Sequence, residues 1–117
     1  MSEIRIIKEP ITKDELKKIA QERFGDLAKG AIDIEQSIMA LGGELHIDEA
    51  VKLHEECQSK SEDMWGINLY PDKTFPELVE FHSMINIRPS QNNRSRNVES
   101  ETTRKTILEI VDSLIKK

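Results

Sequence analysis

Residues 28–47 read AKGAIDIEQSIMALGGELHI, and the conformation of this stretch decides the fold class of the chain. A helix would use apolar residues at three- and four-residue spacing, namely Leu27, Ala31, Ile34, Ile38 and Leu41. A hairpin is favoured by the β-branched isoleucines, by a glycine that would weaken a helix, and by a period of two through Leu41, Leu45 and Ile47. We therefore predict a β-hairpin with its turn near residues 35–37, and we keep the helix as the alternative.

Upstream of this stretch, the pattern predicts one strand and one helix. Ile4, Ile6 and Ile7 indicate a strand that ends before Pro10, a residue without a backbone donor. Thr12 followed by Glu15 has the spacing of a capping box, and apolar residues then recur at helical spacing. We predict a helix over residues 12–24.

Downstream, the chain alternates helix and strand patterns before a polar loop. Asp48 is a suitable N-cap for a second helix that extends to Cys57. Alternating or apolar runs predict strands over 64–70 and 78–88, separated by a loop over 71–76. Residues 89–100, rich in Asn and Ser, predict a surface loop. The last helix is indicated by Ile107, Leu108, Ile110, Val111, Leu114 and Ile115.

The predicted order of elements is strand, helix, strand, strand, helix, strand, strand, helix. Hairpins in this order indicate an α+β fold, which we expect to be a two-layer sandwich of three helices on a mostly antiparallel sheet of about five strands. The 117 residues suit one domain over 1–117, because two halves would each have too small a core.

Composition narrows the functional classes. A net charge of −5 argues against a protein that coats nucleic acid or an anionic membrane by bulk electrostatics. No apolar run approaches the length that spans a bilayer, and MSEIRIIKEP at the start lacks the apolar stretch of a signal peptide, so we expect a cytoplasmic protein. The single cysteine, Cys57, excludes a disulfide within the chain and a zinc site made of several cysteines.

One face of the predicted sheet collects polar side chains. Alternation along the strands places these residues opposite the helices: Glu44, His46, Asn68, Tyr70, Glu80, His82, Asn86 and Arg88. Antiparallel sheets commonly have a solvated face, and that is the simpler interpretation. Imidazoles and carboxylates on one face could also act as acid and base, so His46, His82, Glu44 and Glu80 are the catalytic candidates.

The run Glu44, His46 and Asp48 has the alternate spacing that would project three ligands from one strand toward a divalent metal. The spacing has little specificity, since Asp48 is equally well explained as a helix cap. We assign no metal site firmly and expect no cofactor.

A second polar cluster, RPSQNNRSR over residues 88–96, holds three arginines and several short polar side chains. Arginine presents a planar fork suited to phosphate or carboxylate. The candidate anion-binding residues are Arg88, Asn93, Arg94 and Arg96. We expect the guanidinium groups of the three arginines to converge. The alternative is a solvated loop whose arginines pair with surface acids.

Four segments carry a resemblance to a known family: GGELHID (42–48), WGINLYP (65–71), SMINIRPSQNNRSR (83–96) and the terminal helix. They resemble a family of small prokaryotic single-domain proteins, archaeal or bacterial, of unknown function. The similarity covers nearly the whole chain. It implies a cytosolic single-domain protein and carries over no activity, cofactor or catalytic residue.

No P-loop, dinucleotide-binding glycine motif or HExxH pair occurs in the sequence. Our leading hypothesis is therefore a binding or interaction domain with an unknown ligand or protein partner, and a homodimer is one option. The alternative is a small hydrolase or phosphate-ester enzyme in which His46 or His82 is the base and Arg88 or Arg94 holds the anion. Nucleic-acid binding ranks third because of the acidic net charge.

Overall fold

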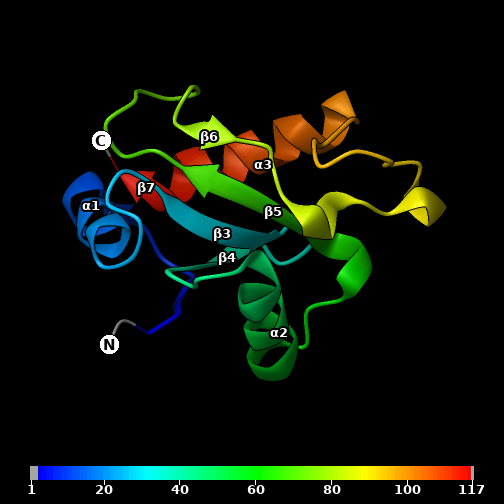
Figure 1. Cartoon of the computed structure of the whole chain (residues 1–117), viewed down its shortest axis with the longest axis horizontal. Coiled ribbons are helices and arrows are strands. Elements are labelled where there is room, and N and C mark those ends of the chain that lie inside the picture. The colour runs from blue at the N-terminus through cyan, green and yellow to red at the C-terminus, as the bar shows by residue number, and fades with distance from the viewer. Residues whose placement is uncertain (1–2, 117) are drawn as a thin grey trace.

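A computed structural model describes residues 3–116. These residues form three α-helices: α1 (Lys13–Gln21), α2 (His46–Cys57) and α3 (Glu101–Leu114). The main sheet is antiparallel throughout, and its strands in spatial order are β1 (Arg5–Ile7), β4 (Ile38–Leu41), β3 (Ala28–Asp33), β5 (Met64–Leu69) and β6 (Val79–Glu80) (Figure 1). The α+β class predicted from the sequence is confirmed.

Short elements complete the chain. A separate parallel pair joins β2 (Ile11–Thr12) to β7 (Ile115–Lys116), which ties the start of α1 to the end of α3. Three 3-10 turns are η1 (Ser61–Asp63), η2 (Met84–Asn86) and η3 (Pro89–Gln91). Within residues 3–116, no helix has the length and apolarity needed to cross a membrane.

The hairpin predicted over residues 28–47 is confirmed as β3 and β4. Asp33 holds its turn, because one carboxylate oxygen accepts hydrogen bonds from the backbone N–H groups of Glu35 and Gln36 at 2.9 and 3.1 Å. The second strand is shorter than predicted. It ends at Leu41 because Gly42 adopts a positive φ of 96°, which turns the chain out of the sheet.

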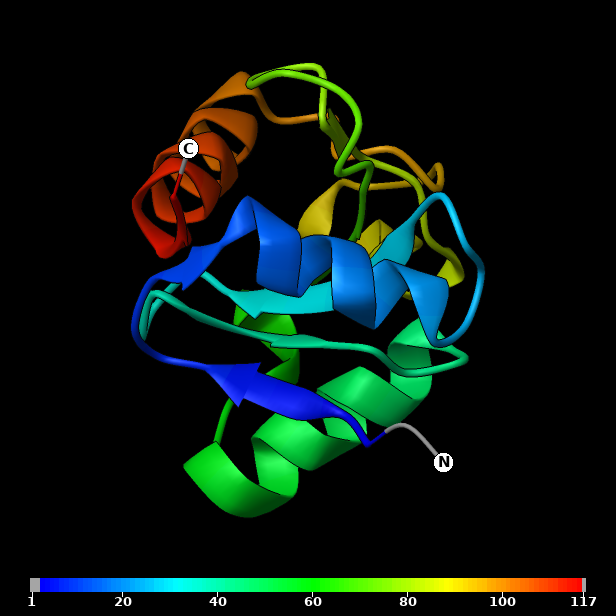
Figure 2. The same ribbon diagram turned by 90° about the vertical axis from the view of Figure 1, so that its left-hand side faces the viewer.

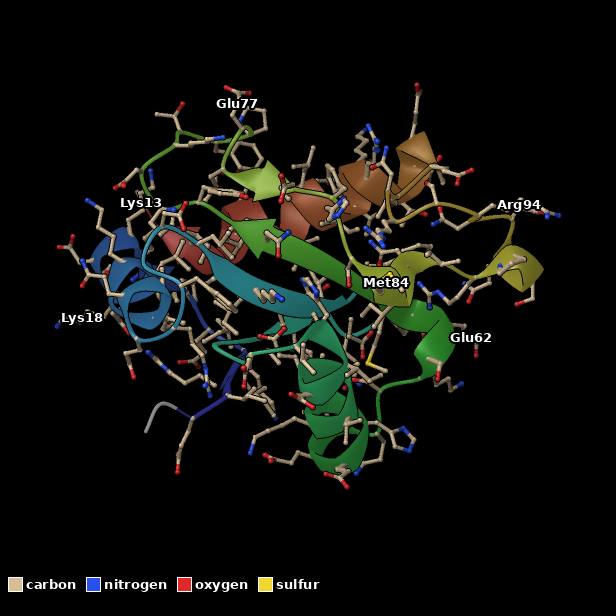
Figure 3. All side chains as sticks on the ribbon, viewed as in Figure 1. Lys13, Lys18, Glu62, Glu77, Met84 and Arg94 are labelled. Atoms are coloured by element: carbon tan, nitrogen blue, oxygen red, sulfur yellow. The ribbon has the colours of Figure 1, made fainter. Side chains whose placement is uncertain are left out.

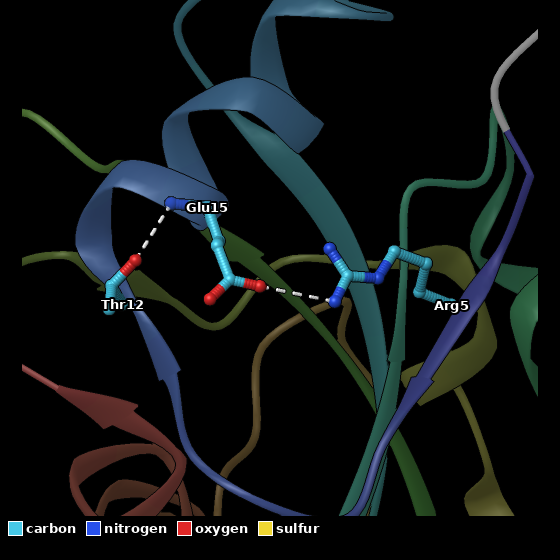
Figure 4. Close-up of polar contacts among 3 residues, drawn as sticks. All are labelled: Arg5, Thr12 and Glu15. Atoms are coloured by element: carbon cyan, nitrogen blue, oxygen red, sulfur yellow. Dashed lines mark hydrogen bonds and ion pairs between the residues drawn. The ribbon is translucent and has the colours of Figure 1, made fainter.

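The cap predicted for the first helix is also present. The Thr12 hydroxyl accepts a hydrogen bond from the Glu15 N–H at 3.1 Å (Figure 4). The Glu15 carboxylate lies 3.3 Å from the Arg5 guanidinium, so its charge links α1 to β1. The helix ends at Gln21, three residues before the predicted end.

The helices cover both faces of the sheet, where the sequence predicted a single helical layer. Figure 2 shows α1 and α3 on one side of the strands and α2 on the other. The larger core lies under α1 and α3 and includes Ile32, Leu41 and Ile67. The smaller core lies under α2, where Ala31 and Ala40 present short side chains that allow the helix to approach the sheet.

The second helix begins earlier than predicted. It starts at His46, with Leu45 in an extended conformation before it, and Asp48 lies in its first turn instead of capping it. His46 and Asp48 are therefore helical, and the predicted strand through Glu44, His46 and Asp48 is wrong. The turn at Gly42 ends the sheet pairing before this run, so alternate residues no longer share a face.

The long strand predicted over residues 78–88 is also wrong. Only β6 pairs with β5, and the chain then leaves the sheet into η2. The Asn86 side chain replaces a strand at this point, since its Oδ1 accepts from the Gly66 N–H at 2.7 Å and its Nδ2 donates to the Gly66 carbonyl at 3.0 Å. A buried amide thus supplies the hydrogen bonds that a paired strand would have given.

Candidate functional site: a polar pocket on the second sheet face

A small polar pocket lies on the sheet face that also carries α2. Its volume is about 240 Å³, and it is lined by Lys29, His46, Asn68, His82, Ser83, Met84 and Arg96. The lining residues come from β3, the start of α2, β5 and the chain after β6. In Figure 3, Met84 marks this region beside the upper end of α2.

Asn68 is the buried centre of the pocket. Its Nδ2 donates to the Glu80 carboxylate at 2.8 Å and to the His82 carbonyl at 3.2 Å. The Glu80 carboxylate and the His82 carbonyl can only accept hydrogen bonds, so the amide nitrogen of Asn68 must point toward them. The Oδ1 atom therefore faces His46.

The orientation of Asn68 assigns the tautomer of His46. The Nε2 atom of His46 lies 2.9 Å from Asn68 Oδ1 and 3.0 Å from the Ile67 carbonyl oxygen, and two acceptors require a proton on Nε2. Burial lowers the pKa of His46; the hydrogen bonds to Ile67 and Asn68 oppose that shift, and the charge of Lys29 lowers the pKa further. In its neutral form His46 then keeps Nδ1 as a proton acceptor.

Glu80 and Tyr70 form the outer part of this network. One Glu80 oxygen accepts from Asn68 and also from the Tyr70 hydroxyl at 3.1 Å. Burial is the main cause that raises the pKa of Tyr70, and the hydrogen bond to Glu80 adds to it. Glu80 acts here by orienting Asn68, and through it His46.

Arg96 reaches the pocket because two hydrogen bonds hold its backbone. The Arg96 carbonyl accepts from the Ser83 N–H at 3.1 Å and from Asn86 Nδ2 at 2.9 Å. The guanidinium then lies at the rim, where its Nε donates to the Met84 sulfur at 3.1 Å. The polar cluster over residues 88–96 thus contributes one cation to the sheet face.

The other two arginines of the loop lie elsewhere, so the predicted convergence of three guanidinium groups is wrong. Arg88 stacks on the Trp65 ring at 4.0 Å and donates to the Ser61 carbonyl; burial lowers its pKa. Arg94 is exposed and extends away from the domain in Figure 3. The two side chains therefore have different surroundings from Arg96.

Asn93 has a structural place within the loop. It is buried, and its Nδ2 donates to three backbone carbonyls, including that of Asn86 at 2.7 Å. The backbone near Arg94 already has an anionic partner within the chain. One oxygen of the Glu99 carboxylate accepts hydrogen bonds from the N–H groups of Arg94 and Ser95, both at 2.9 Å. These hydrogen bonds lower the pKa of Glu99, together with one from the Ser95 hydroxyl, which is the largest cause.

The predicted metal ligands are not brought together. Glu44 is exposed in the turn before α2, and Asp48 is exposed two residues after His46 on the helix, a spacing at which side chains do not face each other. Across the described part of the chain, no three His, Cys, Asp or Glu side chains are placed to share a metal ion.

Sequence reasoning missed Glu49, which lies one turn after His46 on α2. Its side chain is fully buried, and its Oε2 accepts from the Gly43 N–H at 2.9 Å. Burial raises the pKa of the Glu49 carboxyl to about 9, which the Gly43 hydrogen bond and the charge of Lys29 only partly oppose. The sequence did contain a signal for this burial. Glu49 lies four residues before the apolar Leu53, and residues i and i+4 share one face of a helix, so Glu49 lies on the buried face of α2.

A family model described as "Protein of unknown function (DUF5674)" matches residues 5–114. No curated protein and no solved structure matches the chain. The pocket must therefore be interpreted from its own chemistry.

Proposed function

The chain belongs to the DUF5674 family of unknown function, and from this premise we propose that it binds a small anionic ligand in the polar pocket. The observation that carries the proposal is the composition of the lining. Four of its side chains, Lys29, His46, His82 and Arg96, bear nitrogen groups that are cationic or can become so, and none of the seven lining residues is acidic. The whole chain, by contrast, has 22 acidic residues against 17 Lys and Arg.

The volume of the pocket limits the ligand. Pockets for drug-sized molecules are roughly 300 to 1,000 Å³, and this one is about 240 Å³. A phosphate, a carboxylate or a short phosphate ester is the class that fits. Arg96 could offer a planar pair of donors and Lys29 a compact charge, which together suit tetrahedral or planar oxyanions.

Protonation of His46 should strengthen this binding. His46 is largely neutral at pH 7 because its pKa is below the ordinary value of 6.5. A bound anion favours the charged imidazole, so affinity should rise as the pH falls through 6.5 and below.

A titration monitored by backbone amide NMR signals tests the proposal. Sodium phosphate, at constant ionic strength set with chloride, is expected to shift the signals of Lys29, Asn68, His82 and Arg96. Arg96→Ala removes one charged hydrogen bond, worth about 1.5 to 3 kcal/mol, and should weaken binding roughly tenfold or more. Arg94→Ala is the matched control, because this arginine is two residues away and does not line the pocket; it should change affinity less than twofold.

The proposal fails if neither phosphate nor acetate moves these signals at tens of millimolar. It also fails if Arg94→Ala and Arg96→Ala weaken binding equally, since that result indicates bulk charge alone.

A second candidate function is hydrolysis of a small phosphate ester, and the tautomer of His46 favours it. The proton on Nε2 leaves Nδ1 free to accept one from water, while Lys29 and Arg96 hold the anion. Release of phosphate from a chromogenic phosphate ester, abolished by His46→Ala, would support this activity. Ligand binding without turnover leaves the protein a binding domain. We also propose that the protein is cytoplasmic and of prokaryotic origin.

A further inference from the structure

A second pocket shares no residue with the polar pocket. It lies where the loop between β5 and β6 meets the start of α1 and the end of α3, and we call it the loop pocket (Figure 1). Its volume of about 350 Å³ falls within the range of roughly 300 to 1,000 Å³ that small-molecule pockets have. The loop pocket is therefore large enough to hold a small organic molecule.

The lining of the loop pocket is largely apolar. Its apolar side chains are Phe75, Leu78, Val111 and Ile115. Three of them also belong to the core under α1 and α3, whereas Phe75 is 37% exposed. Such a lining favours a ligand with a hydrocarbon part, because binding removes apolar surface of both partners from water.

Hydrogen bonds hold the wall that the loop contributes. The Leu78 N–H donates to the Thr74 carbonyl at 2.9 Å, and the Tyr70 N–H donates to the Leu78 carbonyl at 2.8 Å. Lys13 Nζ, from the first turn of α1, donates to the Lys73 carbonyl at 2.8 Å. The wall and this ammonium group are thus in place before a ligand binds, which lowers the entropic cost of binding.

The charges of the lining select the ligand. Of the eight lining residues, two are lysines and one is an aspartate, so the lining has a net positive charge. Among residues 3–116, neither Lys13 nor Lys116 forms an ion pair, and Lys13 donates one of the three N–H groups of its ammonium to the Lys73 carbonyl. A single carboxylate balances the lining, whereas Asp112 would repel a ligand with a second negative charge.

We propose that the loop pocket binds a small monocarboxylic acid with an aliphatic or aromatic body. The body packs against Phe75, Leu78 and Val111, and the carboxylate accepts hydrogen bonds from the Lys13 ammonium, with the charge of Lys116 nearby. This ligand differs from that of the polar pocket, because it needs an apolar body and phosphate does not fit its charge. The two proposals stand or fall separately.

A series of ligands with one skeleton tests the chemistry by backbone amide NMR titration. Hydrocinnamate is expected to shift the signals of Thr74, Leu78 and Val111 at millimolar concentration. Its amide, which lacks the charge, should bind about tenfold more weakly. Phenylpropylamine should bind more weakly still, because the lining is positive. Phosphate should leave these three signals in place.

Variants test the role of the lysine. Lys13→Gln keeps a donor for the Lys73 carbonyl and removes the charge, so it should weaken hydrocinnamate binding about tenfold and change the affinity for the amide less than twofold. Lys17→Gln is the matched control, because Lys17 pairs with Asp72 of the same loop at 3.5 Å but does not line the pocket; it should change affinity less than twofold. Asp112→Asn should tighten hydrocinnamate binding, since it removes a repulsive charge.

Several outcomes would overturn the proposal. Neither hydrocinnamate nor hexanoate moves these signals at tens of millimolar, the amine binds as tightly as the acid, or Lys13→Gln and Lys17→Gln weaken binding equally. Loss of hydrocinnamate binding in Arg96→Ala would overturn it too, since the acid would then occupy the polar pocket. Unchanged hydrocinnamate binding in that variant, together with weakened phosphate binding, would support two separate sites.

Discussion

Glu49→Gln should change how the stability of the protein depends on pH. The Glu49 carboxyl has a pKa of about 9 in the folded protein, against an ordinary value of 4.5 that the unfolded chain should show. Between these values the folded state retains a proton that the unfolded state has released. The contribution of Glu49 to stability is therefore fully present below about pH 4.5 and is lost as the pH rises toward 9.

The magnitude follows from the size of that interval. Each pH unit within it costs about 1.4 kcal/mol, so this one group should remove about 4 kcal/mol between pH 5 and pH 8. A domain of this kind is stable by only about 5 to 15 kcal/mol in total. The amide introduced by Glu49→Gln would keep an oxygen to accept from the Gly43 N–H and would have no proton to release.

Urea unfolding at pH 5, 6, 7 and 8 measures the effect as a difference in slope between the two proteins. The variant should lose about 4 kcal/mol less than the unmodified protein across this range. Glu55→Gln, an exposed position on the same helix, should keep the original slope. The reasoning is refuted if Glu49→Gln and the unmodified protein lose stability in parallel, because Glu49 would then be ionised in the folded state.

Two further substitutions test the core and the element that positions Arg96. Asn86→Ala leaves the buried N–H and carbonyl of Gly66 without partners, each at about 1 to 3 kcal/mol, so urea unfolding should show a loss of about 2 to 6 kcal/mol. The exposed substitution Gln91→Ala should cost less than about 1 kcal/mol. Leu114→Ala, in the core under α3, should cost about 2 to 5 kcal/mol in the same assay, and a nearly neutral result accompanied by a change in oligomer mass would place this helix in an interface.

The candidate site could be predicted only in part. The alternation argument placed His46, Asn68, Tyr70 and Glu80 on one face, and the structure links them by hydrogen bonds, although His46 arrives from a helix and not from a strand. Their role in binding stays a prediction. Lys29 was missed because one lysine in a strand carries no pattern, and it becomes informative only through its neighbours across the sheet.

The sequence by itself determined the elements whose signals are local. Thr12 and Glu15 mark the start of α1, the isoleucines and the turn expected near residues 35–37 mark the hairpin, and the apolar stripe marks α3, because caps, turns and periodicity act over a few neighbouring residues. Tertiary structure alone decided which face α2 covers and which side chains meet. His46 and Asn68 are 22 residues apart, and Asn86 takes the place of a strand opposite Gly66, 20 residues away. Such contacts form when the sheet brings distant segments together, and no spacing within the chain records them.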